Sequence, residues 1–243
     1  MGKMGIESLR VKLFADGADK VGMQEMYAKP YIKGFTTNPT LMRKAGISDY
    51  MGFAREIIEL IPDRPLSLEV FSDEFHDMEQ QANRLASLSS TVYVKIPITN
   101  SRGESSLPLV QRLSDRGVKV NVTAVMTRQQ IEDSCRALEQ SPGAYLSVFA
   151  GRIADSGIDP VPVMRETVTH LGGYPKTELI WASPRELLNV VQANEVGCHI
   201  ITATNDILKK LSLLGKNLSD FSLETVKMFR DDAIQAGFEI PLT

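Results

Sequence analysis

The sequence contains few of the residues that build disulfide frameworks and metal centres. Its 243 residues include only two cysteines and three histidines. The histidines, His76, His170 and His199, stand far apart without the spacing of a ligand set, so we expect no metal site. Cys135, in an expected helix, and Cys198, in an expected strand, are interpreted as reduced, buried thiols.

The chain also lacks long apolar runs and any excess of positive charge. No run of about 18 apolar residues occurs, and the N-terminal MGKMGIESLR has no apolar signal core. We therefore expect a soluble, cytoplasmic protein without a membrane partner. The 27 basic and 30 acidic residues give a net charge of −3 with no basic block, so a nucleic-acid partner is not expected either.

What the sequence does contain is a regular alternation of short β-rich runs with longer segments of helical period. With 43% hydrophobic residues, the chain can bury a sizeable core. The strands are expected at 11–15, 32–35, 66–71, 91–96, 118–123, 144–149, 177–182 and 198–202. The helices are expected at 18–28, 49–61, 74–88, 104–115, 127–140, 160–171, 184–194 and 205–213. Eight such βα units predict an α/β fold of the TIM (β/α)8 barrel type.

The pattern leaves no room for a second domain, so residues 1–243 are predicted to form a single barrel domain. An open, doubly wound sheet is the alternative, but no GxGxxG follows the first strand. Residues 214–243 remain as a tail with an expected helix near 222–236. Apolar residues recur in this tail near helical spacing, which predicts an additional amphipathic C-terminal helix that packs on its own barrel or on a neighbouring subunit.

The segment TVYVKIPIT carries a lone lysine, Lys95, in an otherwise apolar strand. A partly desolvated ammonium loses hydration, which favours the free amine that attacks carbonyl groups. The alternatives are a lysine that extends to solvent at the barrel rim and one that only pairs with a carboxylate. Glu69, inside the apolar strand PLSLEVF, itself needs a partner, and Lys95 on the adjacent strand is the expected one.

Other polar residues stand where the first, second and fifth strands end, and a barrel enzyme places its chemistry there. The first strand ends in LFAD with Asp16, and the second opens into GFTTNP with Thr36 and Asn38. In the fifth strand, KVNVTAV, Asn121 and Thr123 are two residues apart and therefore point to the same side. Polar groups on the inward side of a barrel strand need hydrogen-bond partners or a ligand.

The sixth strand, YLSVFAGRIAD, places Ser147 and Phe149 on one face and Arg152 in the loop that follows. An aromatic residue on a barrel strand is usually core filling, and an exposed arginine usually faces solvent. Neither residue alone is therefore strong evidence for a binding site.

The seventh strand runs into IWASPREL, which has the signature of a helix start. Ser183 is expected to cap the helix, Pro184 to occupy its first position and Glu186 to close a capping box. A helix N-terminus beside Arg185 is also a candidate phosphate site, to which Arg152 could add a second cation.

Taken in this order and spacing, LFADGAD, GFTTNPTL, VYVKIP, VNVTAV, SVFAGRIADSG and WASPREL resemble the transaldolases. The resemblance is to the short bacterial type that also includes the fructose-6-phosphate aldolases, and it spans roughly residues 11 to 214. It implies a barrel enzyme that forms a Schiff base on a fourth-strand lysine, here Lys95, without metal or cofactor. It also implies sugar phosphate substrates and a homo-oligomer in which the C-terminal tail crosses to a neighbour.

The resemblance further implies a role for each candidate residue. Asp16 would be the acid and base for carbon–carbon cleavage, and Glu69 and Thr123 would hold a water that moves protons. The other implied roles are hydroxyl binding by Asn38, Asn121 and Ser147, with Thr36 beside them, and phosphate binding by Arg152, Ser183 and Arg185. Glu69 together with Phe149 is the pair that the transferases of this family carry, whereas its aldolases carry glutamine and tyrosine.

These features lead to one main hypothesis and to three alternatives. The main hypothesis is a transaldolase that moves a dihydroxyacetone unit between phosphorylated sugars. One alternative is an aldolase that releases dihydroxyacetone, and another is a relative that acts on an unusual acceptor or on a different anionic sugar. The last is a catalytically idle barrel that only binds a sugar phosphate, which the joint presence of Asp16, Glu69, Lys95 and Thr123 disfavours.

Overall fold

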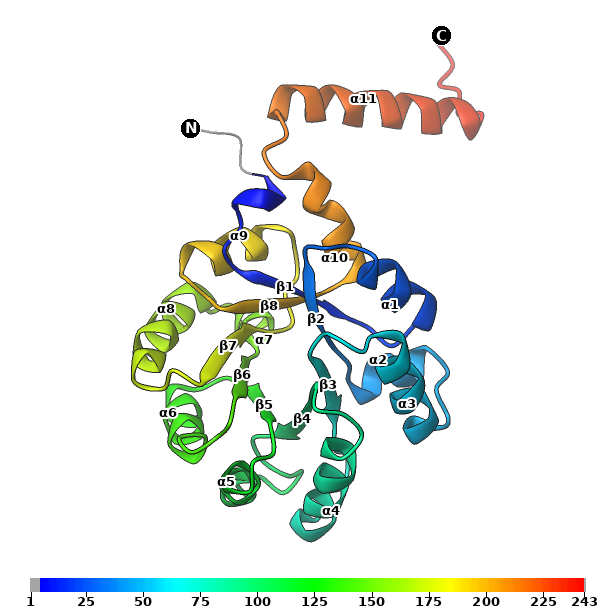
Figure 1. Cartoon of the computed structure of the whole chain (residues 1–243). Coiled ribbons are helices and arrows are strands. Elements are labelled where there is room, and N and C mark those ends of the chain that lie inside the picture. Colours follow the sequence, from blue (N-terminus) through cyan, green and yellow to red (C-terminus); the bar gives the residue numbers. More distant parts are fainter. Residues whose placement is uncertain (1–4, 243) are drawn as a thin grey trace. The chain divides into compact units, whose positions relative to one another are not determined.

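The computed structural model describes residues 5–242, which fall into two compact units. The larger unit, Leu9–Lys209, is a closed barrel in which eight parallel strands pair in sequence order and β8 pairs with β1 (Figure 1). The strands are β1 (Lys12–Asp16), β2 (Ile32–Thr36), β3 (Leu66–Glu69), β4 (Val92–Pro97), β5 (Val120–Val125), β6 (Ala144–Val148), β7 (Thr177–Trp181) and β8 (Ile200–Thr204). The predicted TIM barrel is confirmed, and the closed sheet excludes the doubly wound alternative.

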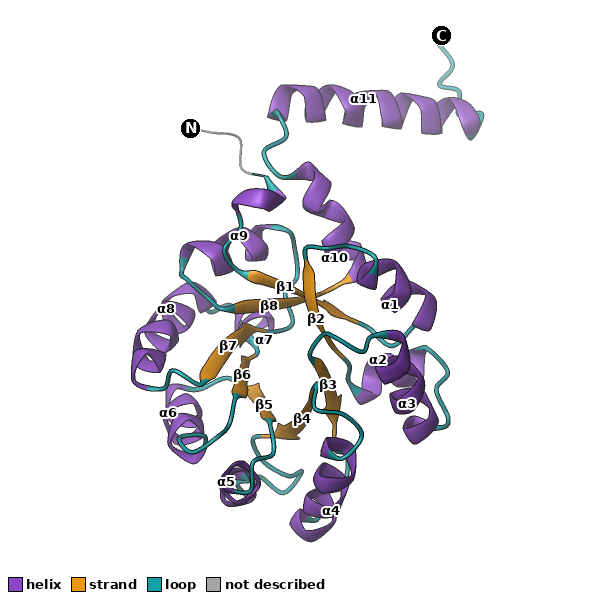
Figure 2. Cartoon of the chain, viewed as in Figure 1, coloured by secondary structure: helices purple, strands orange, loops and turns teal. Residues whose placement is uncertain are grey.

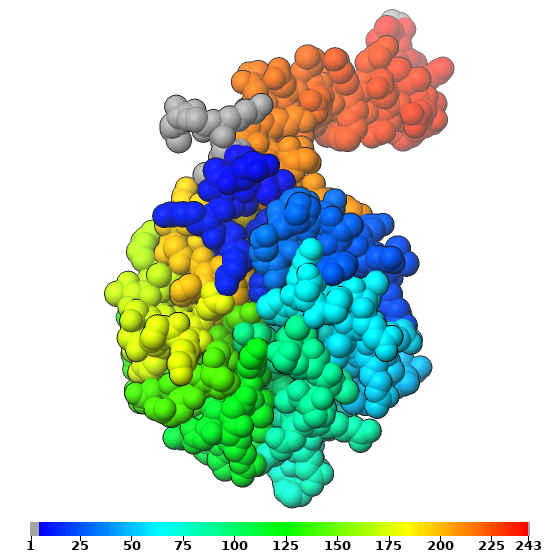
Figure 3. Space-filling view, viewed as in Figure 1, coloured from blue at the N-terminus to red at the C-terminus, as the bar shows by residue number. Residues whose placement is uncertain are grey.

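Helices follow the barrel strands, and most of them lie around the outside of the sheet (Figure 2). They are α1 (Lys20–Tyr27), α2 (Pro39–Lys44), α3 (Tyr50–Leu60), α4 (Phe75–Ala86), α5 (Leu107–Asp115), α6 (Arg128–Ala137), α7 (Ala150–Asp155), α8 (Pro160–His170), α9 (Leu188–Glu195) and α10 (Asn205–Lys209). Short 3-10 turns occur at Ile6–Ser8, Leu171–Gly173 and Lys210–Leu213. In Figure 3 the colours run in order around the barrel unit, as expected when each βα unit lies beside the next.

The helices form because their sequences supply an apolar face and a capped start. In α4, Met78, Ala82 and Leu85 are buried, and their spacing places them on one side of the helix. Helix α6 begins with a complete capping box, in which the Thr127 side chain accepts from the backbone N–H of Gln130 and the Gln130 side chain accepts in return. Local sequence signals and core packing therefore agree in these elements.

The structure departs from the predicted helices in three places. Helices α2 and α7 were not predicted, because six residues are too few to show a helical period. The helix expected at 184–194 instead begins at Leu188. The segment expected at 205–213 divides into α10 and a following 3-10 turn, Lys210–Leu213.

The barrel interior is filled with side chains and is not a pore. Phe14 packs edge-on against Tyr145 with ring centroids 5.8 Å apart, in a buried cluster that also contains Ile180 and Ile200. Gly34, paired with Phe14 across β1 and β2, makes room for this ring, because a Cβ there would lie 2.5 Å from its Cζ atom.

The smaller unit combines residues 5–8 with residues 210–242 and contains helix α11 (Leu218–Gln235). Asn217 caps α11 by accepting from the backbone N–H groups of Ser219 and Asp220. The predicted C-terminal helix is present, although it begins before residue 222. Its exposed apolar residues are Leu218, Phe221, Leu223, Val226, Met228, Phe229 and Ile234.

No helix among residues 5–242 combines the length and the apolar character needed to cross a bilayer.

Candidate active site

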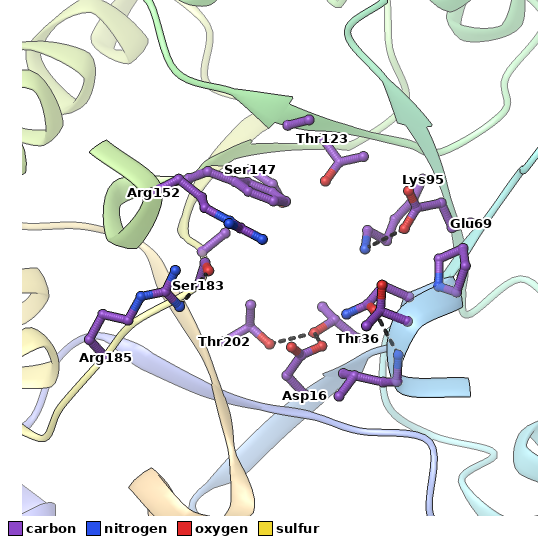
Figure 4. A pocket seen from close by; sticks show the side chains of 17 residues that line it. Asp16, Thr36, Glu69, Lys95, Thr123, Ser147, Arg152, Ser183, Arg185 and Thr202 are labelled. Atoms are coloured by element: carbon purple, nitrogen blue, oxygen red, sulfur yellow. Dashed lines mark hydrogen bonds and ion pairs between the residues drawn. The ribbon is translucent and has the colours of Figure 1, made fainter. Parts of the chain in front are cut away.

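A cavity of about 540 Å³ opens at the carboxyl ends of the barrel strands. Its lining residues are Asp16, Thr36, Asn38, Pro39, Thr40, Leu41, Glu69, Lys95, Thr123, Ala124, Ser147, Phe149, Arg152, Ala182, Ser183, Arg185 and Thr202. Every candidate site residue from the sequence is among them except Asn121. Figure 4 shows Lys95 and Glu69 on one side of this cavity and the group Arg152, Ser183 and Arg185 on the opposite side.

Lys95 lies in β4 with only 6% of its surface exposed. The β3–β4 register pairs Glu69 with Lys95, and Glu69 Oε2 lies 2.8 Å from Lys95 Nζ. Lys95 Nζ also donates to the backbone carbonyl of Thr37 at 2.8 Å. The lysine therefore does not extend to solvent, and its expected partner is confirmed. An amine in this position faces the cavity with a carboxylate beside it to receive a proton.

Thr123 presents a buried hydroxyl that has no hydrogen-bond partner among the described residues. Its side chain lines the cavity, and the residue is 2% exposed. The neighbouring Ala124 has φ of 61°, and the β5–β6 register shifts between Val122 and Val125. A buried hydroxyl without a protein partner is rare in folded proteins, so Thr123 is available to a ligand or to a water in the cavity.

Asp16 ends β1 and holds its carboxylate in a defined orientation. Thr36, its register partner in β2, donates to Asp16 Oδ1 at 2.7 Å, whereas Oδ2 has no hydrogen-bond partner among residues 5–242. Burial removes water from the carboxylate and raises the pKa of Asp16 above its ordinary value. The nearby Lys95 cation and the Thr36 bond lower this pKa by smaller amounts, and the Glu69 charge adds to the increase. A raised pKa suits a group that must both accept and return a proton.

Asn38 and Ser147 line the cavity, and Asn121 is buried against Ser147. Asn38 Oδ1 caps α2 by accepting from the backbone N–H of Leu41 at 3.0 Å. Asn121 is fully buried, where its amide donates to Ser67 Oγ at 3.0 Å and accepts from Ser147 Oγ at 2.7 Å. Sequence analysis placed Asn121 on the correct face but did not show that these partners engage its side chain.

The expected capping role of Ser183 is wrong. Ser183 has φ of 59°, whereas an N-cap residue is normally extended, and helix α9 begins five residues later. Its hydroxyl instead accepts from Arg185 Nη1 at 3.0 Å. The backbone N–H groups of Arg185 and Glu186 are bound by Asn189 Oδ1, at 2.7 and 3.2 Å, so the loop curls around that amide.

The two arginines of this site differ in their partners. Arg185 donates from Nε to Asp155 Oδ1 at 2.9 Å and from Nη2 to Asp155 Oδ2, which forms a bidentate ion pair. Hydrogen bonding from Arg185 lowers the pKa of Asp155. Arg152 lies in α7, three residues before Asp155, and has no ion-pair partner within residues 5–242. The cavity end opposite Lys95 therefore carries one guanidinium in an ion pair and, among the described residues, one without such a pair.

Gly151 holds the two arginine-bearing segments together. Its backbone N–H donates to the carbonyl of Ala182 at 3.3 Å. A Cβ at this position would lie only 1.5 Å from the carbonyl oxygen of Ser183. Helix α7 can therefore approach the loop after β7 only because residue 151 has no side chain.

Three polar residues at the site, Thr40, Thr202 and Asp155, were not singled out from the sequence. Thr202 in β8 lines the cavity, and its hydroxyl lies 2.5 Å from Thr36 Oγ1. The alternation in IITAT places Thr202 inward, but threonine in a strand is common and the pattern alone did not distinguish it. Asp155 was read only as part of the motif around Arg152, because its contact with Arg185 spans 30 residues.

Within the described part of the chain, no group of three or more His, Cys, Asp or Glu side chains could hold a metal ion. A mechanism without metal or cofactor stays a prediction.

Comparison with known proteins identifies relatives of the whole barrel. The sequence profile described as "Transaldolase/Fructose-6-phosphate aldolase" matches residues 13–240. A protein of a Thermoanaerobacter species named "Probable transaldolase" is 34% identical over 231 residues, which cover 95% of this chain and all of the relative. A protein of the same name from Caldicellulosiruptor saccharolyticus is 34% identical over 204 residues, with coverage of 83% and 89%.

Solved structures resemble this one in fold alone. The crystal structure of 2,3-dimethylmalate lyase superimposes with a TM-score of 0.55 and covers 96% of this chain and 83% of its own, but its sequence is only 10% identical. Such a likeness supports the barrel architecture and carries no information about the reaction.

Proposed function

The chain belongs to the transaldolase/fructose-6-phosphate aldolase family, and from this premise we propose that it is a transaldolase that transfers a dihydroxyacetone unit through a Schiff base on Lys95. The observation that carries the proposal is the buried Lys95 Nζ, 2.8 Å from Glu69 Oε2 in a cavity shared with Asp16 and Thr123. Family membership supports aldolase-type chemistry, and this geometry supplies the residues that such chemistry needs.

In the proposed first step, the Lys95 amine attacks the carbonyl carbon of a ketose and forms a carbinolamine. Loss of water then gives an iminium at C2, which accepts the electron pair of the C3–C4 bond when that bond breaks. Glu69 receives the proton that the ammonium must lose before it attacks. A water held between Glu69 and Thr123 would move protons during formation and hydrolysis of the Schiff base. The Thr123 hydroxyl, which has no hydrogen-bond partner among the described residues, supports this part of the proposal.

Cleavage of the C3–C4 bond requires a base at the C4 hydroxyl, and Asp16 is the proposed one. Because Thr36 occupies Oδ1, the unpartnered Oδ2 is the oxygen that takes this proton. The aldehyde product leaves, and the enamine stays on Lys95 until an acceptor aldehyde enters. Asp16 then returns the proton to the oxygen of the acceptor as the new bond forms.

Hydroxyl groups of the dihydroxyacetone unit are proposed to bind Asn38 and Ser147, close to the lysine. Asn121 would act through Ser147, because its side-chain oxygen accepts a hydrogen bond from the Ser147 hydroxyl. The anionic end of the sugar would lie across the cavity at Arg152, Ser183 and Arg185 (Figure 4). An extended ketose phosphate bound in this way places its carbonyl and its phosphate at opposite ends of the site.

We expect Arg152→Ala and Arg185→Ala to raise KM for phosphorylated donors by about ten- to a hundredfold, since each removes a charge-assisted contact. The larger effect is expected for Arg185→Ala, because it also leaves the Asp155 carboxylate unpaired beside the anion. Steady-state kinetics with fructose 6-phosphate and unphosphorylated fructose measure the difference. Arg128→Ala, which removes a surface ion pair with Glu166, is the matched control. Equal effects on both donors would make the two arginines structural.

Transfer is favoured over release of dihydroxyacetone by Glu69 and Phe149, which both line the cavity. A phenol beside the catalytic water could relay a proton to the enamine and so favour hydrolysis, whereas a phenyl ring has no proton to offer. Core filling is the competing account of Phe149, which packs against the buried cluster around Phe14.

The proposed function is tested by measuring dihydroxyacetone with fructose 6-phosphate as donor, with and without an aldose phosphate acceptor. We expect fast exchange in the presence of the acceptor, slow release in its absence, and faster release by Phe149→Tyr. Release without acceptor that is as fast as transfer would favour the aldolase. A native protein that forms no borohydride-trapped adduct with any ketose would instead support an idle binding barrel. Parallel assays with a ketose bearing another anionic group test the remaining alternative.

We also propose that the protein is a homo-oligomer in which α11 packs against another subunit. The exposed apolar residues of α11, Phe221 and Phe229 among them, support this proposal, because water-exposed faces of this kind usually mark interaction surfaces. Deletion of residues 220–243 is expected to give a smaller species on size-exclusion chromatography. An unchanged elution volume, after correction for the lost mass, would remove α11 from the interface. A cytoplasmic location stays a prediction.

A further inference from the structure

Two threonine hydroxyls form a chain that ends on the proposed catalytic carboxylate. Thr36 Oγ1 lies 2.7 Å from Asp16 Oδ1 and 2.5 Å from Thr202 Oγ1 (Figure 4). Thr36 is 2% exposed and Thr202 is 5% exposed. Burying hydroxyl groups is costly unless they are hydrogen bonded, and here both are bonded to each other or to the carboxylate.

The chemistry of the three groups sets the direction of this chain. An ionised carboxylate can only accept hydrogen bonds, so Thr36 must donate its single proton to Asp16. The short contact between the two threonines then requires Thr202 to be the donor to Thr36. The chain therefore runs from Thr202 through Thr36 to Asp16 Oδ1.

We propose that Thr202 is a positioning residue for catalysis, which acts through Thr36 to favour the ionised form of Asp16 and to keep Oδ2 as the oxygen that carries the catalytic proton. This inference rests on the proposed function, because it assumes that Asp16 is the base. Donation from Thr202 polarises the Thr36 hydroxyl and strengthens its bond to the carboxylate, as in other chains of hydrogen bonds. It also prevents Thr36 from turning its proton away from Asp16.

Other charges that face Asp16 come from several strands. Lys95 in β4 stabilises the ionised carboxylate and Glu69 in β3 destabilises it, while Arg152 and Arg185 lie across the cavity. None of these groups is bonded to either threonine, so changes to the threonines leave the charges in place. The two hydroxyls can therefore be tested separately from the charged groups.

The test is the pH dependence of kcat/KM for transfer from fructose 6-phosphate in a graded set of variants. In the cleavage step Asp16 must be ionised, so activity falls as pH decreases through its pKa. Thr36→Val removes the direct donor and should move this acidic limb up by about one pH unit. Thr202→Val removes only the strengthening effect and should move the limb up by about 0.3 pH units, with KM within about twofold of the native value.

Two controls separate this role from a structural one. Thr202→Ser keeps the hydroxyl and should restore the native limb. Thr177→Val makes the same chemical change at the first residue of β7, at the opposite end of the barrel from the cavity, and should have the native profile. Borohydride trapping on Lys95 reports whether each variant folds and forms the Schiff base. If Thr202→Val fails to form the adduct, Thr202→Ala removes the same hydroxyl in a smaller side chain and is judged by the same criterion.

A native acidic limb in the Thr202 variants that form the adduct would overturn the inference, as would a rate loss that Thr202→Ser does not restore. A large increase in KM without a shift of the limb would make Thr202 a substrate contact and would also overturn it. In all these cases the adduct still forms, so the proposed function stands. Absence of the adduct in the native protein would remove the proposed function and this inference together.

Discussion

Lys95→Ala is expected to abolish both transfer activity and reductive trapping, with a loss of activity on the order of 10⁵-fold or more, as for other enzymes that lose their nucleophile. No described side chain beside Lys95 can replace its amine, because the nearest polar groups are the Glu69 carboxylate and the Thr37 carbonyl. The measurement is intact-protein mass spectrometry after incubation with fructose 6-phosphate and borohydride. The native protein should gain one adduct, and the variant none.

Lys12→Ala is the matched control for this experiment. Lys12 is also a strand lysine in an ion pair, with Glu178, but it lies at the opposite end of β1 from the cavity. The Lys12→Ala protein should therefore keep the adduct on Lys95. Because Lys95→Ala leaves Glu69 without its cation, circular dichroism must first show that the variant is folded. An adduct mapped by peptide sequencing to any other lysine would overturn the assignment.

Asp16→Asn is expected to lower transfer by about 10²- to 10⁴-fold, the usual contribution of a general acid or base, while leaving the Schiff base intact. An amide is nearly isosteric with the carboxylate and can still accept from Thr36, but it cannot take up the C4 proton. Trapping by borohydride should therefore persist when turnover is lost. Asp115→Asn, at the exposed end of α5, is the matched control. A variant that loses trapping and turnover together would place Asp16 in Schiff-base formation instead.

The same substitution should increase stability at neutral pH. Burial raises the folded-state pKa of Asp16, so the folded protein binds its proton more tightly than the unfolded chain does. The stability that this group contributes at low pH is lost as pH rises from the unfolded pKa to the raised folded pKa. Asparagine carries no charge at any of these pH values. Thermal unfolding at pH 7 should give a higher Tm for Asp16→Asn, and an unchanged or lower Tm would mean that desolvation of this carboxylate is not costly.

The barrel could be predicted from sequence because local sequence patterns indicate each of its strands and most of its helices. Each strand is a short apolar run, and strand ends converge at one face of the barrel, so Glu69 and Lys95 on adjacent strands had to meet. The register adds the detail that they are direct neighbours. The cavity could therefore be assembled from residues that stand at strand ends.

Contacts between distant segments could not be predicted in this way. Thr36 and Thr202 are 166 residues apart in the sequence. They meet because barrel closure places β8 and β2 on either side of β1. Ser183 looked like a helix cap because sequence does not show its positive φ. Asn121 shares a face with Thr123, but its depth in the barrel decides that it contacts Ser67 and Ser147. Tertiary geometry, and not local preference, determines all of these features.

The glycine at position 151 has a practical consequence for engineering this site. Helix α7 and the loop after β7 touch backbone to backbone at Gly151 and Ser183, so the spacing between Arg152 and Arg185 depends on this contact. We expect a combinatorial library that varies either arginine alone to change the chemistry of the proposed anion site and to keep the contact between Gly151 and Ser183. A redesign for donors of another length needs a different spacing between the two arginines. Residues 149–155 and 182–189 should then be exchanged together. Variation of one segment without the other would break the close contact on which both depend.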